Sequence, residues 1–312
     1  MTYSQEDQRA LFDLSQQYLR GEHPADERRQ LEELQKLILY HEHRYYVLND
    51  PVVSDFEYDT LYKKLEAIEE AHPDWVSPSS PTQRVSADLT ADFKPVEHLT
   101  PMLSLGNSYN PDDLFEFDTQ IKKLLGMPAD TDVEYAVEPK YDGSSIALVY
   151  EGDQLLRAAT RGNGAVGEDI TANARVIRSI PLQAAFSQHG IHRVELRGEV
   201  LIRKDSFKKI NEERAEEGLA LFANPRNAAA GGLRMKDPKE TARRGLEAFV
   251  YQLGLAEDAL GANVSDRFAT HYESLDFLAK LGFKTPTVER KLCRNISEVA
   301  AFCDEWQQKR ED

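Results

Sequence analysis

The stretch VEYAVEPKYDGSSIALVY, residues 133–150, determines the predicted fold of this sequence. Its two ends, 133–137 and 145–150, are short runs rich in β-branched and aromatic side chains, as is typical of strands. Between them lies Lys140-Tyr141-Asp142-Gly143, which places an amine at a strand end beside a turn-forming Asp-Gly pair. Alone, this four-residue string fits a solvated lysine before a hairpin as well as it fits a reactive amine.

Further β-rich runs follow at 192–202 and 246–254, with turns and helical stretches between them. The helical pattern predicts helices at 168–177, 204–217, 224–233, 266–281 and 297–309. The sequence from residue 93 onward therefore predicts an α+β domain.

The first 92 residues follow the helical period instead. Apolar side chains recur three, four or seven residues apart between 26 and 49, and an earlier helix is predicted within 1–21. Ser54 and Glu57 have the spacing of a capping box, which predicts that another helix starts there. The segment HPDWVSPSSPTQRV that follows is rich in proline and serine, as linkers are. We predict a helical domain over 1–92, with its linker at about 72–92, and a second domain over 93–312.

Composition narrows the class of protein. The 312 residues suit two domains, and 41% hydrophobic with 29% charged residues excludes a fibrous or wholly disordered chain. The net charge of −16 argues against coating of nucleic acid by bulk charge, although a local basic track remains possible. No apolar run approaches the ~18–20 residues that cross a bilayer, and no signal peptide opens the chain. We expect a cytoplasmic protein without a membrane partner.

Two cysteines, Cys293 and Cys303, are too few for a disulfide framework or a four-thiolate zinc site. We expect both to be reduced thiols, and we expect no protein zinc ligands in this sequence.

Several strings beyond the lysine carry a family resemblance. In chain order they are SDFEYD (54–59), YDGSSIALVY (141–150, directly after EPK), TRGNGAVGEDITANARVIRSIP (160–181), LRGEV (196–200) and FANPRNAAAGGLR (222–234). In this order they resemble the N-terminal helical domain and the adenylation domain of the NAD-dependent bacterial DNA ligases. The resemblance covers nearly the whole chain, and it implies a nucleotidyltransferase fold, similar to ATP-grasp, with antiparallel sheets.

The resemblance implies that Lys140 attacks the α-phosphate of NAD, expels nicotinamide mononucleotide (NMN) and retains AMP, with Asp142 among the catalytic residues. The chemistry suits an amine, which attacks phosphorus only when it is unprotonated. A nearby Mg²⁺ would lower the pKa of this amine and neutralise charge on the phosphoryl oxygens.

Two more residues are candidates for the phosphate and ribose. Arg161 can approach a phosphate closely because Gly162 and Gly164 permit unusual backbone angles. Glu199, within a predicted strand, is a carboxylate of the kind that orders the ribose or the water shell of a metal. A structural salt bridge is the alternative for Glu199.

The adenine has its own candidates. Glu138 stands two residues before Lys140, so in a strand both would point to the same face. The resemblance implies that Glu138 reads the adenine, and that Ser104 and Leu105 contact it through their backbone. Core packing is the alternative for this apolar run.

The helical domain carries the candidates for the nicotinamide half of NAD. Asp55, Tyr58 and Asp59 stand at i, i+3 and i+4 and share one helix face. Two carboxylates and an aromatic ring suit the hydroxyls and cationic ring of nicotinamide ribose. A polar helix start is the alternative. Tyr45 and Tyr46 match a family tyrosine that is followed by histidine or tyrosine.

A basic track is the candidate contact with DNA. Arg226 and Arg234 flank a stretch of small residues, and four more lysines and arginines follow up to residue 244. A solvated helix face is the alternative to a phosphate-binding track. The resemblance implies that Arg226 and Arg234 contact nicked double-stranded DNA independently of base sequence, and we expect a monomer.

Two other functions remain open. An ATP- or GTP-dependent ligase or a capping nucleotidyltransferase shares the lysine motif, and a non-catalytic NAD- or DNA-binding fragment would leave Lys140 idle. The family's adenylation domain continues to an Asp-Gly-Val-Val-x-Lys strand, and later segments include a four-cysteine zinc module. Because neither occurs in this sequence, we expect the N-terminal portion of a longer ligase.

Overall fold

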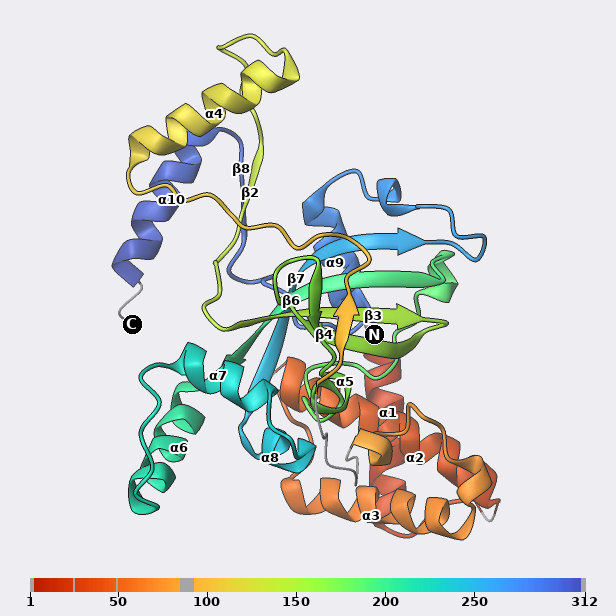
Figure 1. Cartoon of the computed structure of the whole chain (residues 1–312). Helices are drawn as coiled ribbons and strands as arrows, with labels where there is room; N and C mark the ends of the chain where they lie inside the picture. Colours follow the sequence, from red (N-terminus) through yellow and green to blue (C-terminus); the bar gives the residue numbers. More distant parts are fainter. Residues whose placement is uncertain (1–2, 25, 49, 85–92, 310–312) are drawn as a thin grey trace.

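The computed structural model describes residues 3–24, 26–48, 50–84 and 93–309, apart from the side chains of Tyr46, Val47, Asp55, Arg84 and Lys309. Three helices open the chain: α1 (Gln5–Leu19), α2 (Glu27–Glu42) and α3 (Asp55–Ala71). Figure 1 shows them grouped in red and orange at one end of the molecule. They pack around a core of their own that includes Tyr18, Leu34 and Leu61.

The predicted start of α3 is confirmed. The Ser54 hydroxyl accepts a hydrogen bond from the backbone N–H of Glu57, and the Glu57 carboxylate accepts one from the backbone N–H of Ser54. The helix before it ends earlier than the spacing predicts. The α-helical hydrogen bonds of α2 stop at Glu42, and His43–Val47 forms one turn of π-helix, η1. Such π-turns occur often at functional sites.

A four-stranded antiparallel sheet forms the centre of the molecule (Figure 1). Its strands are β3 (Ser144–Glu151), β4 (Gln154–Thr160), β6 (Arg193–Ile202) and β7 (Leu246–Glu257), in the order β4-β3-β6-β7. Alternate residues of β3 divide the two faces, because side chains alternate across a strand. Ile146 and Leu148 join the main hydrophobic core, whereas Ser145 lies on the opposite face with Glu199 of β6 as its partner in register.

Helices cover the core side of the sheet or extend from its edges. They are α5 (Thr171–Arg175), α6 (Lys204–Glu216), α7 (Pro225–Leu233), α8 (Pro238–Arg243) and α9 (His271–Lys280). Residues from α5, α7 and α9 contribute to the main hydrophobic core. Two short strands, β1 (Pro95–Glu97) and β5 (Val166–Glu168), pair with each other.

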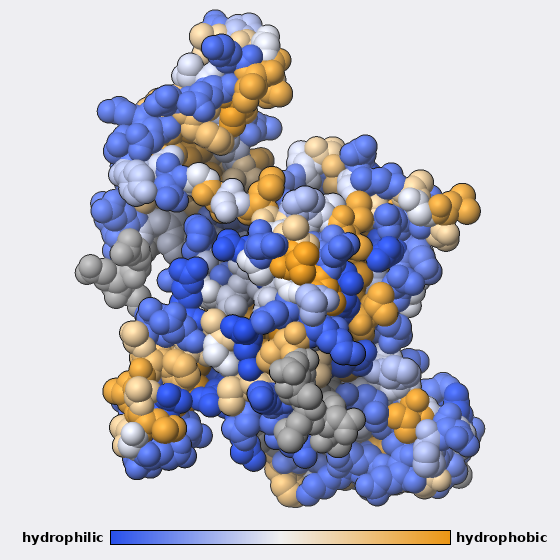
Figure 2. All heavy atoms as spheres, viewed as in Figure 1, coloured by the Kyte–Doolittle hydropathy of each residue, from blue (hydrophilic) through white to orange (hydrophobic). Residues whose placement is uncertain are grey.

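A smaller lobe stands apart from the central sheet at the upper left of Figure 1. Strand β2 (Tyr135–Val137) pairs with β8 (Lys291–Cys293), and α4 (Pro111–Leu125) packs with α10 (Ile296–Lys309) around a third small core. Figure 2 shows apolar residues on the surface of this lobe, where Phe115, Phe117, Leu124 and Leu125 are exposed.

The α+β fold with antiparallel sheets is confirmed, and two predicted helices begin several residues later than expected. The helix predicted at 168–177 begins only at Thr171, because Glu168 belongs to strand β5, which pairs with β1. The predicted helix at 266–281 begins at His271, where the Thr270 hydroxyl caps it by accepting from the Glu273 N–H. Strand β4 and helix α4 were not predicted.

The predicted linker contains two 3₁₀ turns, η2 (Pro73–Trp75) and η3 (Pro81–Arg84). Its end at residues 85–92 lies outside the described residues, so the domain boundary at 92 stays a prediction. Among the described helices, none combines the length and apolar character needed to span a membrane. Cys293 is buried and Cys303 is exposed, and both are free thiols.

Candidate active site

The loop that carries Lys140 is held against strand β6. Lys140 is exposed and lies between the end of β2 at Val137 and the start of β3 at Ser144. The backbone N–H of Gly143 donates a hydrogen bond of 3.1 Å to Oε1 of Glu199. A Cβ at Gly143 would fall 2.1 Å from the carbonyl oxygen of Val200, so only glycine allows this approach. The Asp-Gly pair thereby fixes the lysine loop beside Glu199.

Glu199 is a buried carboxylate that faces the lysine loop. It is 9% exposed, and its Oε2 accepts a hydrogen bond of 2.8 Å from the Ser145 hydroxyl. Burial raises the pKa of Glu199, while its hydrogen bonds and the charges of Lys140 and Arg226 act in the opposite direction. Two basic side chains therefore lie close enough to act on this carboxylate. Among the described residues, Glu199 has no ion-pair partner within 4.0 Å, so a structural salt bridge does not explain it.

The glycines around Arg161 adopt the predicted backbone angles. Gly162 has φ 55° and Gly164 has φ 95°, and a Cβ at Gly162 would lie 1.9 Å from the carbonyl oxygen of Val166. The side chain of Arg161 is exposed at the end of β4. The charge of Arg161 also acts on Tyr251 of β7, whose pKa burial raises.

Tyr251 is a neighbour of the site that the sequence patterns did not indicate. The charge of Glu199 raises its pKa further, and a hydrogen bond with Ser145 lowers it. The register between β6 and β7 shifts between Arg197 and Gly198, so that Tyr251 is the extra residue of a bulge. Bulges often re-aim a side chain next to a functional site. The sequence FVYQLG predicts a strand and nothing more, so it does not indicate that Tyr251 lies beside the site.

Glu138 and Lys140 do not lie together in one strand, although the sequence predicts that they do. Strand β2 ends at Val137, so Glu138 and Lys140 do not share a strand face; Glu138 is half-buried and Lys140 is exposed. Oε1 of Glu138 lies 2.9 Å from Nε2 of His271, at ion-pair distance but without the alignment of a hydrogen bond. His271 opens helix α9 and was not among the predicted site residues.

The run MLSL at 102–105 does not pack into the core as a whole. Met102 is buried, whereas Leu103, Ser104 and Leu105 are exposed. Core packing is therefore wrong for Ser104 and Leu105, whose apolar and backbone surface is free to contact a ligand.

A pocket in the helical domain brings together several of the predicted nicotinamide residues. It is lined by residues of α2, η1, the loop before α3 and α3, and by one residue of the larger domain: His41, Glu42, Tyr45, Pro51, Val52, Val53, Ser54, Tyr58, Asp59 and Arg178. Tyr45, Tyr58 and Asp59 thus share one cavity. The side chains of Asp55 and Tyr46 lie outside the described part of the structure. Neither Lys140 nor Glu199 lines this pocket.

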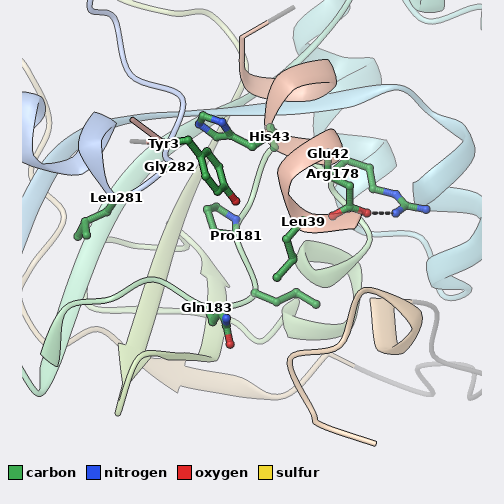
Figure 3. Close-up of a pocket in the computed structure, with 11 residues that line it drawn as sticks. Tyr3, Leu39, Glu42, His43, Arg178, Pro181, Gln183, Leu281 and Gly282 are labelled. Carbon is green, nitrogen blue, oxygen red and sulfur yellow. Dashed lines mark hydrogen bonds and ion pairs between the residues drawn. The ribbon is translucent and has the colours of Figure 1, made fainter. Parts of the chain in front are cut away.

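An ion pair joins the two domains beside this pocket. Nη1 of Arg178 pairs with Oε1 of Glu42, and the Tyr58 hydroxyl donates a hydrogen bond of 3.1 Å to the same oxygen. Figure 3 shows this pair at the end of a second pocket, between α2 and the segment that contains Pro181. Glu42 is almost fully buried. The sequence offered no signal for a pair 136 residues apart.

Both arginines predicted to contact DNA lie beside carboxylates. Nε of Arg226 lies 3.6 Å from Oδ1 of Asp142, and Nη2 of Arg234 lies 2.7 Å from Oε1 of Glu168. The four side chains are exposed or half-exposed, so water screens both pairs. Arg226 opens α7 and Arg234 follows it, which places both charges on one short helix.

Comparisons with known proteins identify the family of the chain. Residues 90–312 match a family model described as the NAD-dependent DNA ligase adenylation domain, and residues 24–86 match one described as the DNA ligase-like, N-terminal NAD+-binding domain.

Individual relatives agree as well. The DNA ligase of Sulfurihydrogenibium azorense is 52% identical over 99% of this chain and 44% of its own length. The DNA ligase of Persephonella marina is 56% identical over 90% of this chain and 39% of its own length. This chain therefore spans about two fifths of the length of these relatives. Both family models are described by NAD, and neither supports an enzyme that uses ATP or GTP. The chain belongs to the NAD-dependent DNA ligase family, of which it carries the N-terminal NAD+-binding domain and the adenylation domain.

Proposed function

We propose that this chain carries out the adenylation step of NAD-dependent DNA ligation. The unprotonated Nζ of Lys140 attacks the α-phosphate of NAD and forms a P–N bond, while the P–O bond to the NMN phosphate breaks. The electron pair of that bond leaves with NMN, the attacking nitrogen gives up one proton to solvent, to which Lys140 is exposed, and AMP remains on the lysine. The observation that carries this proposal is the Gly143–Glu199 hydrogen bond, which holds the lysine loop against a buried carboxylate.

The neighbouring residues have separable roles in this proposal. Arg161 lies beside Gly162 and Gly164, whose backbone angles would let its guanidinium approach a phosphate and bind it in a bidentate manner. Glu199 would accept hydrogen bonds from the ribose hydroxyls, and Glu138 would recognise the adenine. Asp142 would hold the lysine loop in position. The exposed Ser104 and Leu105 would contact the adenine through their backbone.

Magnesium is the expected metal, and the residues present fit it. The described residues contain no cluster of three or more histidine, cysteine or acidic side chains that could hold a metal alone. Mg²⁺ does not need one, because it is usually bound by one or two carboxylates together with substrate phosphates and water. Glu199 offers such a carboxylate beside the lysine loop. When bound, the ion would neutralise charge on the phosphoryl oxygens.

The helical domain would bind the nicotinamide half of NAD. Asp59, Tyr45 and Tyr58 line one pocket, and a carboxylate with aromatic rings suits ribose hydroxyls and a cationic ring. By the same resemblance, Asp55 and Tyr46 belong to this site. Because Lys140 does not line the pocket, we propose that the helical domain moves toward the lysine loop when NAD is bound.

The partner proposed for the adenylated protein is nicked double-stranded DNA, contacted without base specificity through Arg226 and Arg234. Their screened pairs with Asp142 and Glu168 can exchange for phosphate at little cost. We further propose that the chain acts as a monomer in the bacterial cytoplasm.

Incubation with NAD labelled in its adenylate moiety, followed by denaturing electrophoresis, tests the proposal. We expect label on the protein, stable to alkali and labile to acid, as a phosphoramidate is. Lys140→Ala should abolish it, whereas Lys208→Ala, which changes an exposed lysine of α6, should not. Label that persists in Lys140→Ala refutes the assignment. Label from ATP or GTP instead of NAD favours the other nucleotidyltransferases, and absence of label favours a non-catalytic fragment.

A further inference from the structure

Strand β6 presents three charged side chains on the face that carries the candidate site. Glu195, Arg197 and Glu199 alternate along the strand and therefore point to the same side of the sheet. They are 0%, 7% and 9% exposed. Glu199 belongs to the site described above, but Glu195 and Arg197 have no role there. Charges this deeply buried are costly unless they are paired and hydrogen-bonded, so their partners indicate what they do.

Glu195 binds the backbone of a single short segment. Its Oε2 accepts a hydrogen bond of 2.8 Å from the N–H of Leu99, and its Oε1 accepts bonds from the N–H and the hydroxyl of Thr100 at 3.3 and 3.2 Å. The carboxylate thus holds two consecutive residues that lie almost 100 positions earlier in the chain.

Arg197 binds the same segment from the next position on the strand. Its Nη2 donates to the carbonyl oxygens of Thr100 and Pro101 at 3.1 and 2.8 Å, and to the Thr100 hydroxyl at 2.6 Å. Its Nη1 donates to the side chain of Gln252 at 3.3 Å. The Thr100 hydroxyl therefore links the two buried charges, since it donates to one and accepts from the other.

The opposite side of this segment is bonded to the loop of Arg161. The N–H of His98 donates to the carbonyl oxygen of Ala165 at 3.0 Å, and the N–H of Met102 donates to that of Gly164 at 2.8 Å. Nε2 of His98 lies 3.1 Å from the carbonyl oxygen of Arg161 itself. Residues 98–102 consequently lie between the buried charges of β6 and the loop that carries Arg161, and they lead directly into Ser104 and Leu105.

Gly254 of β7 gives Arg197 the room that it needs. A Cβ at this position would lie 3.3 Å from Nε of Arg197 and 3.4 Å from the Thr100 hydroxyl. The register between β6 and β7 also shifts between Glu195 and Leu196, which makes Gly254 part of a bulge. A side chain here would crowd both the guanidinium of Arg197 and the Thr100 hydroxyl to which it donates.

We infer that Glu195 and Arg197 are positioning residues for the adenylate half of NAD. They hold residues 99–101 in place. This segment in turn fixes the positions of the Arg161 loop and of the start of the Ser104-Leu105 run. The inference rests on the proposed function, in which those two elements contact phosphate and adenine. The residues would act through this segment rather than touch the nucleotide.

Thr100→Val tests the inference, because it keeps the shape of the side chain and removes the hydroxyl that joins the two charges. We expect the affinity for AMP to fall by roughly tenfold to a hundredfold, the range associated with lost hydrogen bonds to charged groups. The affinity for NMN should not change, because NMN would bind the helical domain. Amide hydrogen exchange should rise in residues 103–107.

Matched variants separate positioning from general loss of stability. Thr100→Ser keeps the hydroxyl and should retain the wild-type affinity for AMP. Thr285→Val removes a buried hydroxyl that makes no hydrogen bond among the described residues, and it should change neither affinity. Gly254→Ala should reproduce the loss of AMP affinity by crowding Arg197 and the Thr100 hydroxyl.

Unchanged AMP affinity in Thr100→Val, or parallel losses of AMP and NMN affinity, would overturn the inference. Labelling of wild-type Lys140 by NAD is a separate measurement. Its failure would count against the proposed function even if AMP binding depends on Thr100 as expected.

Discussion

Nε of Arg226 lies 3.6 Å from Oδ1 of Asp142, so the helix that carries the basic track is linked to the loop that carries Lys140. Both side chains are largely exposed, and exposed pairs of this kind contribute only about 0–1 kcal/mol. The contact therefore places Arg226 beside the loop of Lys140, the proposed nucleophile, without holding it tightly to a carboxylate. In the proposed function, a DNA phosphate would replace Asp142 as the partner of Arg226.

We predict that Arg226→Ala and Arg234→Ala weaken binding of nicked duplex DNA. Each change should lower the slope of log affinity against log salt concentration by about one, since each removes one phosphate contact. Adenylation by NAD should continue. Arg294→Ala is the control, because Arg294 lies outside the track, between β8 and α10, and is exposed and paired with Glu298 of α10. Equal salt slopes in all three variants would show that the two arginines do not meet phosphate.

We predict that Asp59→Asn weakens NMN binding by about tenfold, the order expected when a charged acceptor of ribose hydroxyls is lost. The AMP affinity should stay at its wild-type value, because the adenylate half binds elsewhere. Glu66→Gln, on the same helix but outside the pocket, should affect neither nucleotide. Calorimetric titration with NMN and with AMP measures both. A fall in both affinities would mean that Asp59 is structural.

We predict that Arg178→Met lowers the free energy of unfolding by about 3–5 kcal/mol, because it leaves the buried carboxylate of Glu42 without its charged partner. It should also loosen the contact between the domains, visible as a larger radius of gyration in X-ray scattering. A double-mutant cycle with Glu42→Gln isolates the pair. If the two single losses simply add, the ion pair does not couple the domains.

We predict that Glu199→Gln raises the melting temperature at pH 7 but not at pH 4. Burial raises the folded-state pKa of Glu199, so the folded protein binds more protons than the unfolded chain between the two pKa values. Stability is then lost as pH rises through this interval. Glutamine does not ionise, so the substitution removes the cost of burying a charged carboxylate at this position. Glu212→Gln, at an exposed site, should show no such trend, and a wild-type advantage at pH 7 would contradict the argument.

We predict that acid unfolds the helical domain before the central sheet. Burial lowers the pKa of His41 to about 4, and its Nε2 lies 2.8 Å from the buried Ser15 hydroxyl. The unfolded chain takes up this proton first, so stability falls as pH drops from about 6.5 to 4, by on the order of 3 kcal/mol. Burial lowers the pKa of His43 to about 4 as well.

Hydrogen exchange resolved by segment measures this prediction between pH 4 and pH 7. His41→Gln should flatten the loss for α1–α3, whereas the exposed His192→Gln should not. Simultaneous opening of helices and sheet at every pH would contradict it.

The parts of the molecule that sequence predicted best are those governed by local interactions. The capping box at Ser54, the glycine angles beside Arg161 and the strand that carries Glu199 all follow from residues within a few positions of one another. Helix α4 was not predicted, although Asn110 and Pro111 form an ordinary helix start signal.

Local sequence patterns could not predict contacts between residues that are far apart in the chain. The pair of Glu42 with Arg178, the approach of His271 to Glu138 and the bulge at Tyr251 depend on how separate elements pack. The wrong start of the helix at 168 has the same origin: Val166–Glu168 is a strand only because β1, some 70 residues earlier, pairs with it. Strand registers of this kind are set by partners rather than by propensity.

The long chain separations within the site bear on how the protein folds during synthesis. The bond from Gly143 to Glu199 spans 56 residues, and the bond from Leu99 to Glu195 spans 96. Bonds among α1–α3 span fewer residues, 26 from Ser15 to His41 and 34 from Gln35 to Glu69. High contact order slows folding, because loop closure must precede the contacts that reward it. As the nascent chain leaves the ribosome, the helical domain can form first. The proposed adenylate site cannot form until β6 has emerged and joined the sheet, so AMP binding at this site would report completion of the larger domain.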